Sequence, residues 1–182
     1  MMSKRIAALA GRRIDAPEAK IARFPFAEMP RVRRELRDLF AGERIETLVC
    51  AAACGADLIA LEQALDLGMR CRVVLPFPVD VFRRLSVVDR PGDWGALYDT
   101  IIDNASATNE LIELDDQINL QAAFSAANRR ILLEAARDND RPFAVVAWDG
   151  VTRGPDDVTA EFLALAVDSN FDLRTIETCR TR

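Results

Sequence analysis

The stretch at residues 45–65, IETLVCAAACGADLIALEQAL, decides the fold. Its first eight residues are apolar almost throughout, which is typical of a strand that is buried on both faces of a sheet. Small residues follow, and then Leu58, Leu61 and Leu65 recur at helical spacing. A buried strand, a tight turn and an amphipathic helix in this order predict one unit of a parallel α/β sheet.

The same pattern recurs along the chain. Five further apolar runs rich in Val, Ile and Leu predict strands at residues 6–10, 71–75, 110–114, 143–148 and 171–176. Helical spacing predicts helices between most of these runs, among them a long helix over residues 119–137. The alternation predicts an α/β fold of three-layer Rossmann-like type, with a mostly parallel sheet of about six strands. We expect one domain over residues 1–182, because this length suits a single hydrophobic core.

The composition is that of a globular protein. Half of the residues are hydrophobic, 29% are charged and the mean hydropathy is +0.01. The apolar run at residues 6–10 is too short for a secretory or membrane-spanning segment. Four cysteines lack the spacing of a disulfide framework, which favours reduced thiols. We therefore expect a cytoplasmic protein without a membrane partner.

The sequence contains no histidine, which excludes Ser-His and Cys-His nucleophilic machinery. Cys50 and Cys54 would lie about 13 Å apart on a single strand, too far apart to hold one metal ion together. Only thiolates and carboxylates would remain as ligands for zinc. We expect no metal and no cofactor.

The net charge of −5 is unevenly distributed. Residues 1–44 hold 11 Lys/Arg against 6 Asp/Glu, whereas the remainder holds 13 against 23. The amino-terminal part could therefore face an anion, although its arginines at positions 31, 33, 34 and 37 are also explained as the solvated face of a helix. The acidic overall balance argues against nucleic acid as a partner.

The first strand runs into Gly11, Arg12, Arg13 and Asp15. Ligands of open α/β sheets bind beyond the carboxyl ends of the strands, which is where this loop is expected to lie. Arginine can fork onto phosphate or carboxylate oxygens, and glycine lets a ligand approach the backbone. The alternative is a surface turn with two solvated arginines.

The second strand ends in Cys54, Gly55, Ala56 and Asp57. Small side chains at the amino terminus of a helix leave backbone N–H groups open to an anion. The alternative is tight packing, with Asp57 as the helix cap. Glu62 lies beside the stripe that should be buried, so its carboxylate needs a partner, either an arginine or the ribose or base of a ligand.

The fifth strand ends in Asp149 and Gly150, and a loop through Gly154 leads to the helix that contains Thr159. These residues could hold a ligand, or they could serve only the turn and the first turn of the helix. The least regular stretch, at residues 89–94, contains a Pro-Gly turn and could be mobile over a site.

These strand ends resemble the SLOG superfamily, which includes the Lonely Guy (LOG) phosphoribohydrolases and the Rossmann domain of bacterial DNA-processing proteins. The motifs that carry the resemblance extend over residues 6–166, and they are Gly11-Arg12-Arg13-Ile14-Asp15, Ala53-Cys54-Gly55-Ala56-Asp57 with Glu62, Leu75-Pro76-Phe77 with Phe82, Ser86 and Val87, and Ala147-Trp148-Asp149-Gly150 with Gly154 and Thr159. The resemblance implies a nucleotide-derived ligand between the early strand ends and the loop after the fifth strand. It also implies a homodimer.

The chain departs from the family pattern in the first loop and in the loop after the fifth strand. Arg12 stands where the family has a histidine, and Asp157 and Val158 replace a glycine pair, with Asp156 ahead of them. Carboxylates at that loop would repel a phosphate. The glutamate that the LOG enzymes carry three positions after the threonine is Phe162 here, with Glu161 adjacent. Its loss argues against hydrolysis.

Three functions fit these residues. The leading hypothesis is binding or sensing of a nucleotide-derived small molecule, which requires no catalytic group. The alternative is a LOG-like hydrolase of the N-glycosidic bond of a nucleoside monophosphate, in which Glu62 or Glu161 assists water or the departing base. The third is an eroded site that leaves a dimerisation or scaffold surface. No catalytic residue is assigned.

Overall fold

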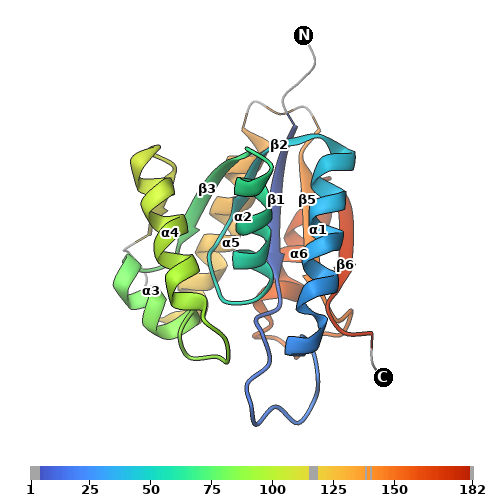
Figure 1. The fold of residues 1–182 in the computed structure, drawn as a ribbon. Helices are drawn as coiled ribbons and strands as arrows, with labels where there is room; N and C mark the ends of the chain where they lie inside the picture. The colour runs from blue at the N-terminus through green and yellow to red at the C-terminus, as the bar shows by residue number, and fades with distance from the viewer. Residues whose placement is uncertain (1–4, 115–118, 138, 140, 181–182) are drawn as a thin grey trace.

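The computed structural model describes residues 5–114, 119–137, 139 and 141–180. Within this part of the chain, a central sheet is covered by helices on both faces (Figure 1). All five neighbouring strand pairs run parallel, and the strand order is β4-β3-β2-β1-β5-β6. This arrangement confirms the expected Rossmann-like α/β fold, and the sheet is parallel throughout rather than mostly parallel.

The strands lie where the apolar runs predict them. They are β1 (Arg5–Gly11), β2 (Ile45–Cys50), β3 (Arg70–Leu75), β4 (Leu111–Glu113), β5 (Phe143–Trp148) and β6 (Asp172–Glu177). β2 ends two residues earlier than the run at 45–52 suggests, because Ala51 and Ala52 already belong to the turn toward the next helix. Small apolar residues suit either place, so composition alone could not set this boundary.

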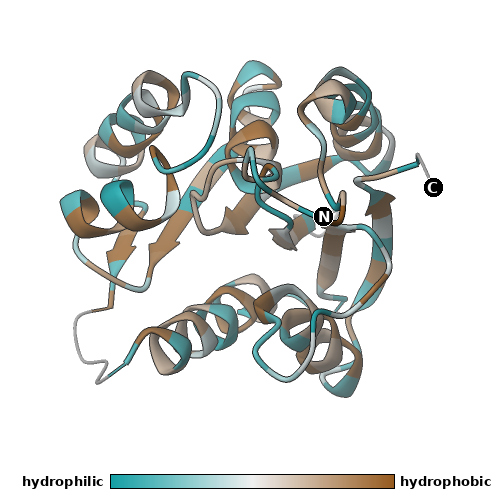
Figure 2. Cartoon of the chain, turned by 90° about the horizontal axis from the view of Figure 1, so that it is seen from below, coloured by the Kyte–Doolittle hydropathy of each residue, from teal (hydrophilic) through white to brown (hydrophobic). Residues whose placement is uncertain are grey.

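The helices form the two outer layers. They are α1 (Met29–Glu43), α2 (Ala56–Asp66), α3 (Val79–Ser86), α4 (Trp94–Ala107), α5 (Leu120–Ala136) and α6 (Val158–Asp168), with a short 3-10 turn η1 (Phe26–Glu28) before α1. Figure 2 shows α1, α2 and α4 on one face of the sheet and α5 and α6 on the other. Among the described residues, no helix is both long and apolar enough to cross a membrane.

Each face of the sheet has its own hydrophobic core. Successive strand residues point to opposite faces, so Leu9 and Leu48 belong to the core under α1 and α2, whereas Ala8 and Val49 belong to the core under α5 and α6. Both faces are buried, which is why the strands read as continuous apolar runs rather than as alternating ones.

The order of the strands reverses at β1. From β1 the chain proceeds through β2, β3 and β4 in one direction, and then returns through α5 to place β5 on the other side of β1. The loops that follow β1 and β5 therefore leave the sheet beside each other. A crevice at such a reversal is the usual ligand site of an open α/β sheet.

Candidate ligand pocket

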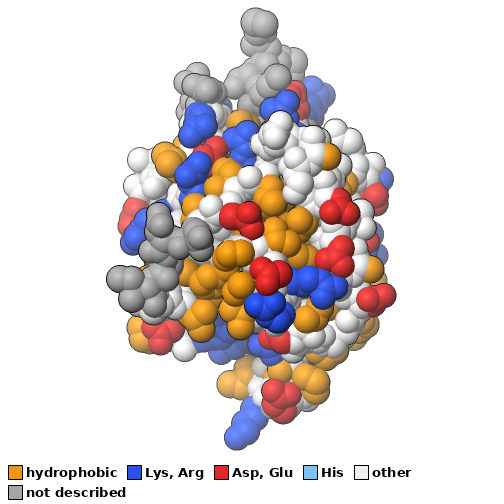
Figure 3. All heavy atoms as spheres, turned by 90° about the vertical axis from the view of Figure 1, so that its left-hand side faces the viewer, with side chains coloured by type: hydrophobic (Ala, Val, Ile, Leu, Met, Phe, Trp, Pro, Cys, Tyr) orange, Lys and Arg blue, Asp and Glu red, His pale blue; other side chains and the backbone are white. Residues whose placement is uncertain are grey.

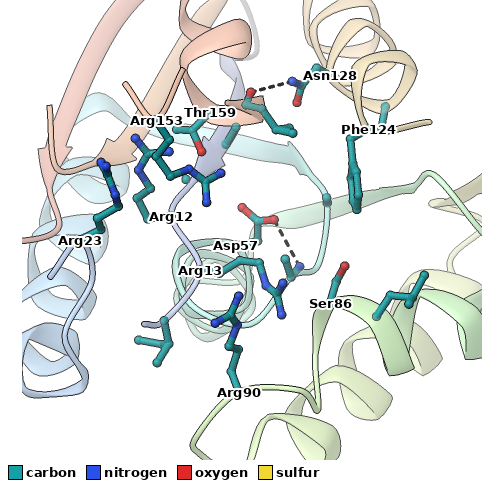
Figure 4. Close-up of a pocket in the computed structure, with 18 of the residues that line it drawn as sticks. Arg12, Arg13, Arg23, Asp57, Ser86, Arg90, Phe124, Asn128, Arg153 and Thr159 are labelled. Carbon is teal, nitrogen blue, oxygen red and sulfur yellow. Dashed lines mark hydrogen bonds between the residues drawn. The ribbon is translucent and has the colours of Figure 1, made fainter. Parts of the chain in front are cut away.

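A cavity of about 470 Å³ lies at the carboxyl ends of the strands beside this reversal. Its volume falls within the range of small-molecule sites, about 300 to 1,000 Å³. The lining is largely apolar and includes Phe82, Phe124 and Ile131. Five arginines also line it, which are Arg12, Arg13, Arg23, Arg90 and Arg153, together with the carboxylates of Asp15 and Asp57 (Figure 4). The cavity thus offers an apolar space that is bordered mainly by positive charge.

Arg12 is fully engaged by the protein itself. Its Nε donates to Asp149 Oδ1 (2.8 Å), its Nη1 to Asp157 Oδ1 (2.6 Å) and its Nη2 to the carbonyl of Val151 (2.6 Å). The side chain is 3% exposed and lies over the ring of Trp148. Arg12 therefore ties the first loop to the loop between β5 and α6.

Asp157 occupies the place where that loop could have held an anion. It caps α6 by accepting from the N–H groups of Thr159 and Ala160, and its other oxygen accepts from the N–H of Arg153 at 2.8 Å. Burial alone would raise the pKa of Asp157, but the bonds from Arg12 and the backbone outweigh it and lower the pKa to about 2. The carboxylate that we expected to repel a phosphate is buried and also satisfies the helix terminus, while Asp156 is exposed.

We call Arg12, Asp149 and Asp157 the saturated wall; Arg12 lines the pocket, and the two aspartates bind Arg12 from outside the lining. Asp149 completes it, because its second oxygen accepts from Nη1 of Arg23 at 2.7 Å. Each carboxylate is therefore bound by at least one arginine, and both are buried.

Arg13, Asp57 and Arg90 form a different wall, which we call the open wall. Among the described residues, three buried side-chain polar atoms lack a hydrogen-bond partner, and they are Arg13 Nε, Asp57 Oδ1 and Arg90 Nε. All three side chains line the cavity. Arg13 Nη2 bonds Asp89, and Arg90 Nε lies 3.6 Å from the same carboxylate. The open wall therefore combines two cations with unused hydrogen-bonding capacity.

Asp57 is the most buried member of the open wall, with 6% of the residue exposed. It lies in the first turn of α2, and its Oδ2 accepts from the N–H of Ala53 at 3.3 Å. Burial raises the pKa of Asp57 to about 7, and neither the Ala53 bond nor the charge of Arg13 offsets this effect. The carboxyl group is thus poised to change its charge near neutral pH.

The amino terminus of α2 is closed by the first loop. Arg13 forms an isolated β-bridge with Gly55, and the N–H of Ala56 donates to the carbonyl of Arg12 at 3.1 Å. Gly55 has φ +108°, and a Cβ there would lie 2.7 Å from backbone atoms of Arg12 and Ile14. The small residues at the start of α2 therefore leave room for the backbone of the first loop to pack against this helix end.

Hydrogen bonds of Asp15 fix the conformation of the first loop. Its carboxylate accepts from the N–H groups of Arg23 and Phe24, and the N–H of Asp15 donates to the carbonyl of Phe24. Gly11 lies where the loop begins, and a Cβ there would meet Ala56 and Ala147 at less than 3 Å. These contacts set the position of Arg12 and Arg13 at the cavity.

The structure brings some of the expected site residues into the cavity and leaves others outside it. The lining includes Gly11, Arg12, Arg13, Asp15, Asp57 and Thr159. The lining does not include Cys54, Gly55, Ala56, Glu62, Asp149, Gly150 and Gly154. Some of the residues outside the lining contact residues within it. The thiol of Cys54 lies 3.6 Å from Nη2 of Arg13, and Asp149 accepts a hydrogen bond from Arg12.

Neither of the two carboxylates expected to serve a hydrolase is part of the lining. Glu62 Oε2 accepts from Arg33 Nε at 2.8 Å, so its partner is an arginine, one of the two partners expected from the sequence. Glu161 accepts from Ser125 at 2.9 Å and from Asn128 at 3.4 Å. Neither residue lines the pocket, and Asp57 is the deeply buried carboxyl that does.

Sequence reasoning missed several contributors to the lining, among them Arg23, Arg90, Phe124, Asn128 and Arg153. Arg90 comes from the irregular stretch that we expected to lie over a site. Asn128 is a polar residue four positions after Phe124 on the buried stripe of α5, and its Nδ2 donates to the carbonyl of Val158 at 2.9 Å. A buried amide on an apolar stripe was the available signal.

No protein-family model and no curated protein matches the sequence. Among solved structures, the fold is similar to DNA processing protein A (DprA) from Streptococcus pneumoniae, with 17% identity and a TM-score of 0.45 over 96% of this chain and 59% of that one. DprA from Helicobacter pylori is 16% identical, with a TM-score of 0.42 over 94% of this chain and 75% of that one. The chain thus spans about three fifths of the Streptococcus protein.

The Helicobacter protein is described as binding single-stranded DNA. This finding overturns our expectation that nucleic acid can be set aside as a partner. The physical reason is that net charge averages over the whole surface, whereas recognition depends on local charge. The acidic chain gathers five arginines around one cavity.

Proposed function

We propose that the pocket binds a nucleotide-derived small molecule, as the resemblance to the SLOG superfamily implies. The observation that carries this proposal is the open wall, where two arginines and an aspartate line a largely apolar cavity and each keeps a buried polar atom without a hydrogen-bond partner. Buried polar groups without partners cost stability, so a fold that retains three of them in one cavity favours a ligand that satisfies them.

We place the anionic group of the ligand against Arg13 and Arg90. Their guanidinium groups can fork onto phosphate oxygens. The amino terminus of α6 is the poorer position for that group, because Asp157 already satisfies its N–H groups and carries a negative charge. Within the part of the chain that the structure describes, one carboxylate, that of Asp89, forms ion pairs with the two arginines of the open wall.

The apolar side of the cavity suits the base. Phe124 and Ile131 from α5 and Phe82 from α3 line this part, and Figure 4 shows the Phe124 ring facing the space between the walls. Phe124 also packs edge-on against Phe77, which fixes its ring. Asn128 on α5 and Thr159, which Figure 4 shows beside Arg12 and Arg153, add polar groups to the lining that can orient the ligand.

The other expected residues set the geometry of this site. Gly11, Asp15, Gly55 and Ala56 position the first loop, while Arg12 and Asp149 hold the saturated wall and with it the loop of Gly150 and Gly154. We propose binding rather than hydrolysis, because neither Glu62 nor Glu161 lines the cavity.

A thermal-shift screen tests this function. Purified protein is mixed with nucleotides, nucleotide sugars, dinucleotides and short single-stranded oligonucleotides. We expect a small molecule to raise the melting temperature, and Arg13→Ala to abolish the rise. Arg34→Ala is the matched control, because this arginine is exposed on α1, away from the cavity.

Two results would contradict the proposal. A shift that Arg13→Ala leaves intact would place the ligand elsewhere. A shift with oligonucleotides alone would replace the small molecule by nucleic acid as the occupant.

A further inference from the structure

The unpartnered oxygen of Asp57 has a specific setting. Its residue is 6% exposed, and in Figure 4 the carboxylate lies in the cavity between Arg13 and Arg90 on one side and Arg12 and Arg153 on the other. One oxygen bonds Ala53, and the other, Oδ1, has no partner. Because Asp57 lines the cavity, this buried oxygen is the hydrogen-bonding position that a ligand at this wall would satisfy.

The charged and titratable groups around Asp57 come from four elements. Arg13 belongs to the loop after β1, Arg90 to the loop after α3 and Arg153 to the loop after β5, while the thiol of Cys50 lies behind it at the end of β2. Burial raises the pKa of the Cys50 thiol well above its usual range, so that group stays neutral. Arg13 is the cation that favours the charged form of Asp57.

A bound anion changes this balance. An anion on Arg13 and Arg90 neutralises the charge that favours the Asp57 carboxylate, and it adds a negative charge nearby. Both effects favour the protonated carboxyl group. A protonated Oδ1 is also a donor, and it can give its hydrogen to a ligand oxygen. The empty pocket and the filled pocket should therefore differ by one proton.

Resting on the proposed function, we propose that Asp57 is a proton-dependent recognition group, which takes up a proton when an anionic nucleotide binds to the open wall. Solvent supplies the proton, Asp57 Oδ1 binds it, and the protonated carboxyl donates to a phosphate oxygen. No covalent bond forms or breaks. The ligand class is then an anion that accepts a hydrogen bond at Asp57 and presents no cation there.

The direction of the pH dependence follows from the empty pocket. Burial raises the pKa of Asp57 to about 7, so below this pH the carboxyl is already protonated and binding is unaffected by pH. Above it, each binding event must take up one proton. The affinity should then fall by about tenfold for each pH unit.

Calorimetric titrations of the full chain with cyclic adenosine monophosphate and with ADP-ribose test the inference between about pH 5.5 and about pH 8.5, a range in which the phosphates of these probes do not titrate. We expect the fall in affinity above neutral pH for the wild type. Asp57→Asn, an uncharged carboxamide of the same shape, should bind with constant affinity and more tightly than the wild type at the alkaline end. Asp66→Asn, an exposed change at the end of the same helix, should behave as the wild type.

Proton uptake gives a second readout that does not depend on the variant. The heat of binding in two buffers of different ionisation enthalpy should show one proton taken up at alkaline pH. Affinity that is constant or rises with pH, or a fall that persists in Asp57→Asn, would overturn the inference and leave the proposed function standing. No binding of either probe at any pH would also overturn it, whereas the proposed function falls only if the whole screen fails.

Discussion

The saturated wall and the open wall each place a buried aspartate beside an arginine. On the saturated wall, Asp157 accepts from Arg12 and from three backbone N–H groups, and its pKa is lowered to about 2. On the open wall, Asp57 accepts one bond, from Ala53, and burial raises its pKa to about 7. Two aspartates therefore have different roles. The hydrogen bonds of Asp157 are satisfied within the fold, whereas one oxygen of Asp57 is left for a ligand to satisfy.

The same contrast separates two arginines that are adjacent in the sequence. Arg12 is 3% exposed and binds three acceptors, whereas Arg13 is 27% exposed and keeps Nε without a partner. The charge of a side chain alone therefore does not identify it as a ligand-binding residue. What marks it is hydrogen-bonding capacity that the protein does not use itself.

The largest effect should come from breaking the saturated wall. Arg12→Ala leaves two buried carboxylates, Asp149 and Asp157, without their main cation, and should lower the free energy of unfolding by about 3 to 5 kcal/mol. Chemical denaturation at neutral pH measures this loss. Arg13→Ala, its neighbour on the open wall, should cost about 1 kcal/mol or less, since its side chain is partly exposed. Equal losses in the two variants would contradict the distinction between the walls.

A gain in stability should come from the open wall. The native protein retains a proton on Asp57 that the unfolded chain releases above about pH 4, so the stability contributed by this group falls as the pH rises from about 4 to about 7. Asp57→Asn removes this penalty and should raise the free energy of unfolding at about pH 8 by about 2 to 4 kcal/mol.

The measurement is a denaturation series for Asp57→Asn and the wild type across that range. The two proteins should converge toward the acid end. A variant that is less stable than the wild type at alkaline pH would show that the carboxylate has partners in the fold after all.

A smaller effect of opposite sign should come from Asp157. Its lowered pKa stabilises the fold above about pH 4, and this contribution is lost as the pH falls through about 2. Asp157→Asn should therefore cost about 2 kcal/mol at neutral pH and little at the acid end. Acid unfolding monitored by circular dichroism checks it, and a loss that is independent of pH would mean that Asp157 acts through packing rather than charge.

Most of the fold could be predicted from the sequence, because it depends on patterns within short stretches. Six apolar runs marked the six strands, and helical spacing marked the helices between them. The parallel pairing of the strands followed from the preference for β-α-β units, whereas the order of the strands was not predicted. The boundary of β2 was missed because alanine suits both a strand end and a turn.

The site could be predicted only as a set of loops. Arg12 bonds residues 137 and 145 positions away, and no local pattern shows which of two adjacent arginines makes those bonds. Asp57 could be identified as a buried aspartate at a helix start, but its unpartnered oxygen depends on how three loops meet. Arg90 lay in a stretch that was recognised only as irregular.

The face of the molecule beside α3 and α4 carries exposed hydrophobic side chains close to the pocket. Figure 3 shows hydrophobic side chains gathered near the centre of this face, with acidic and basic side chains around and among them. Among the side chains of α3, Leu85 is 44% exposed and also lines the pocket. Leu85 therefore joins the lining of the cavity to the exposed surface of this face, whereas Arg12 of the saturated wall is buried by its own hydrogen bonds.

The most direct test of this account is a crystal structure of the protein with a nucleotide that the thermal-shift screen identifies. We expect the phosphate between Arg13 and Arg90, with Asp57 Oδ1 within hydrogen-bond distance of a ligand oxygen, and Asp157 still bound to Arg12. A phosphate at the amino terminus of α6, with the carboxylate of Asp157 displaced, would contradict it.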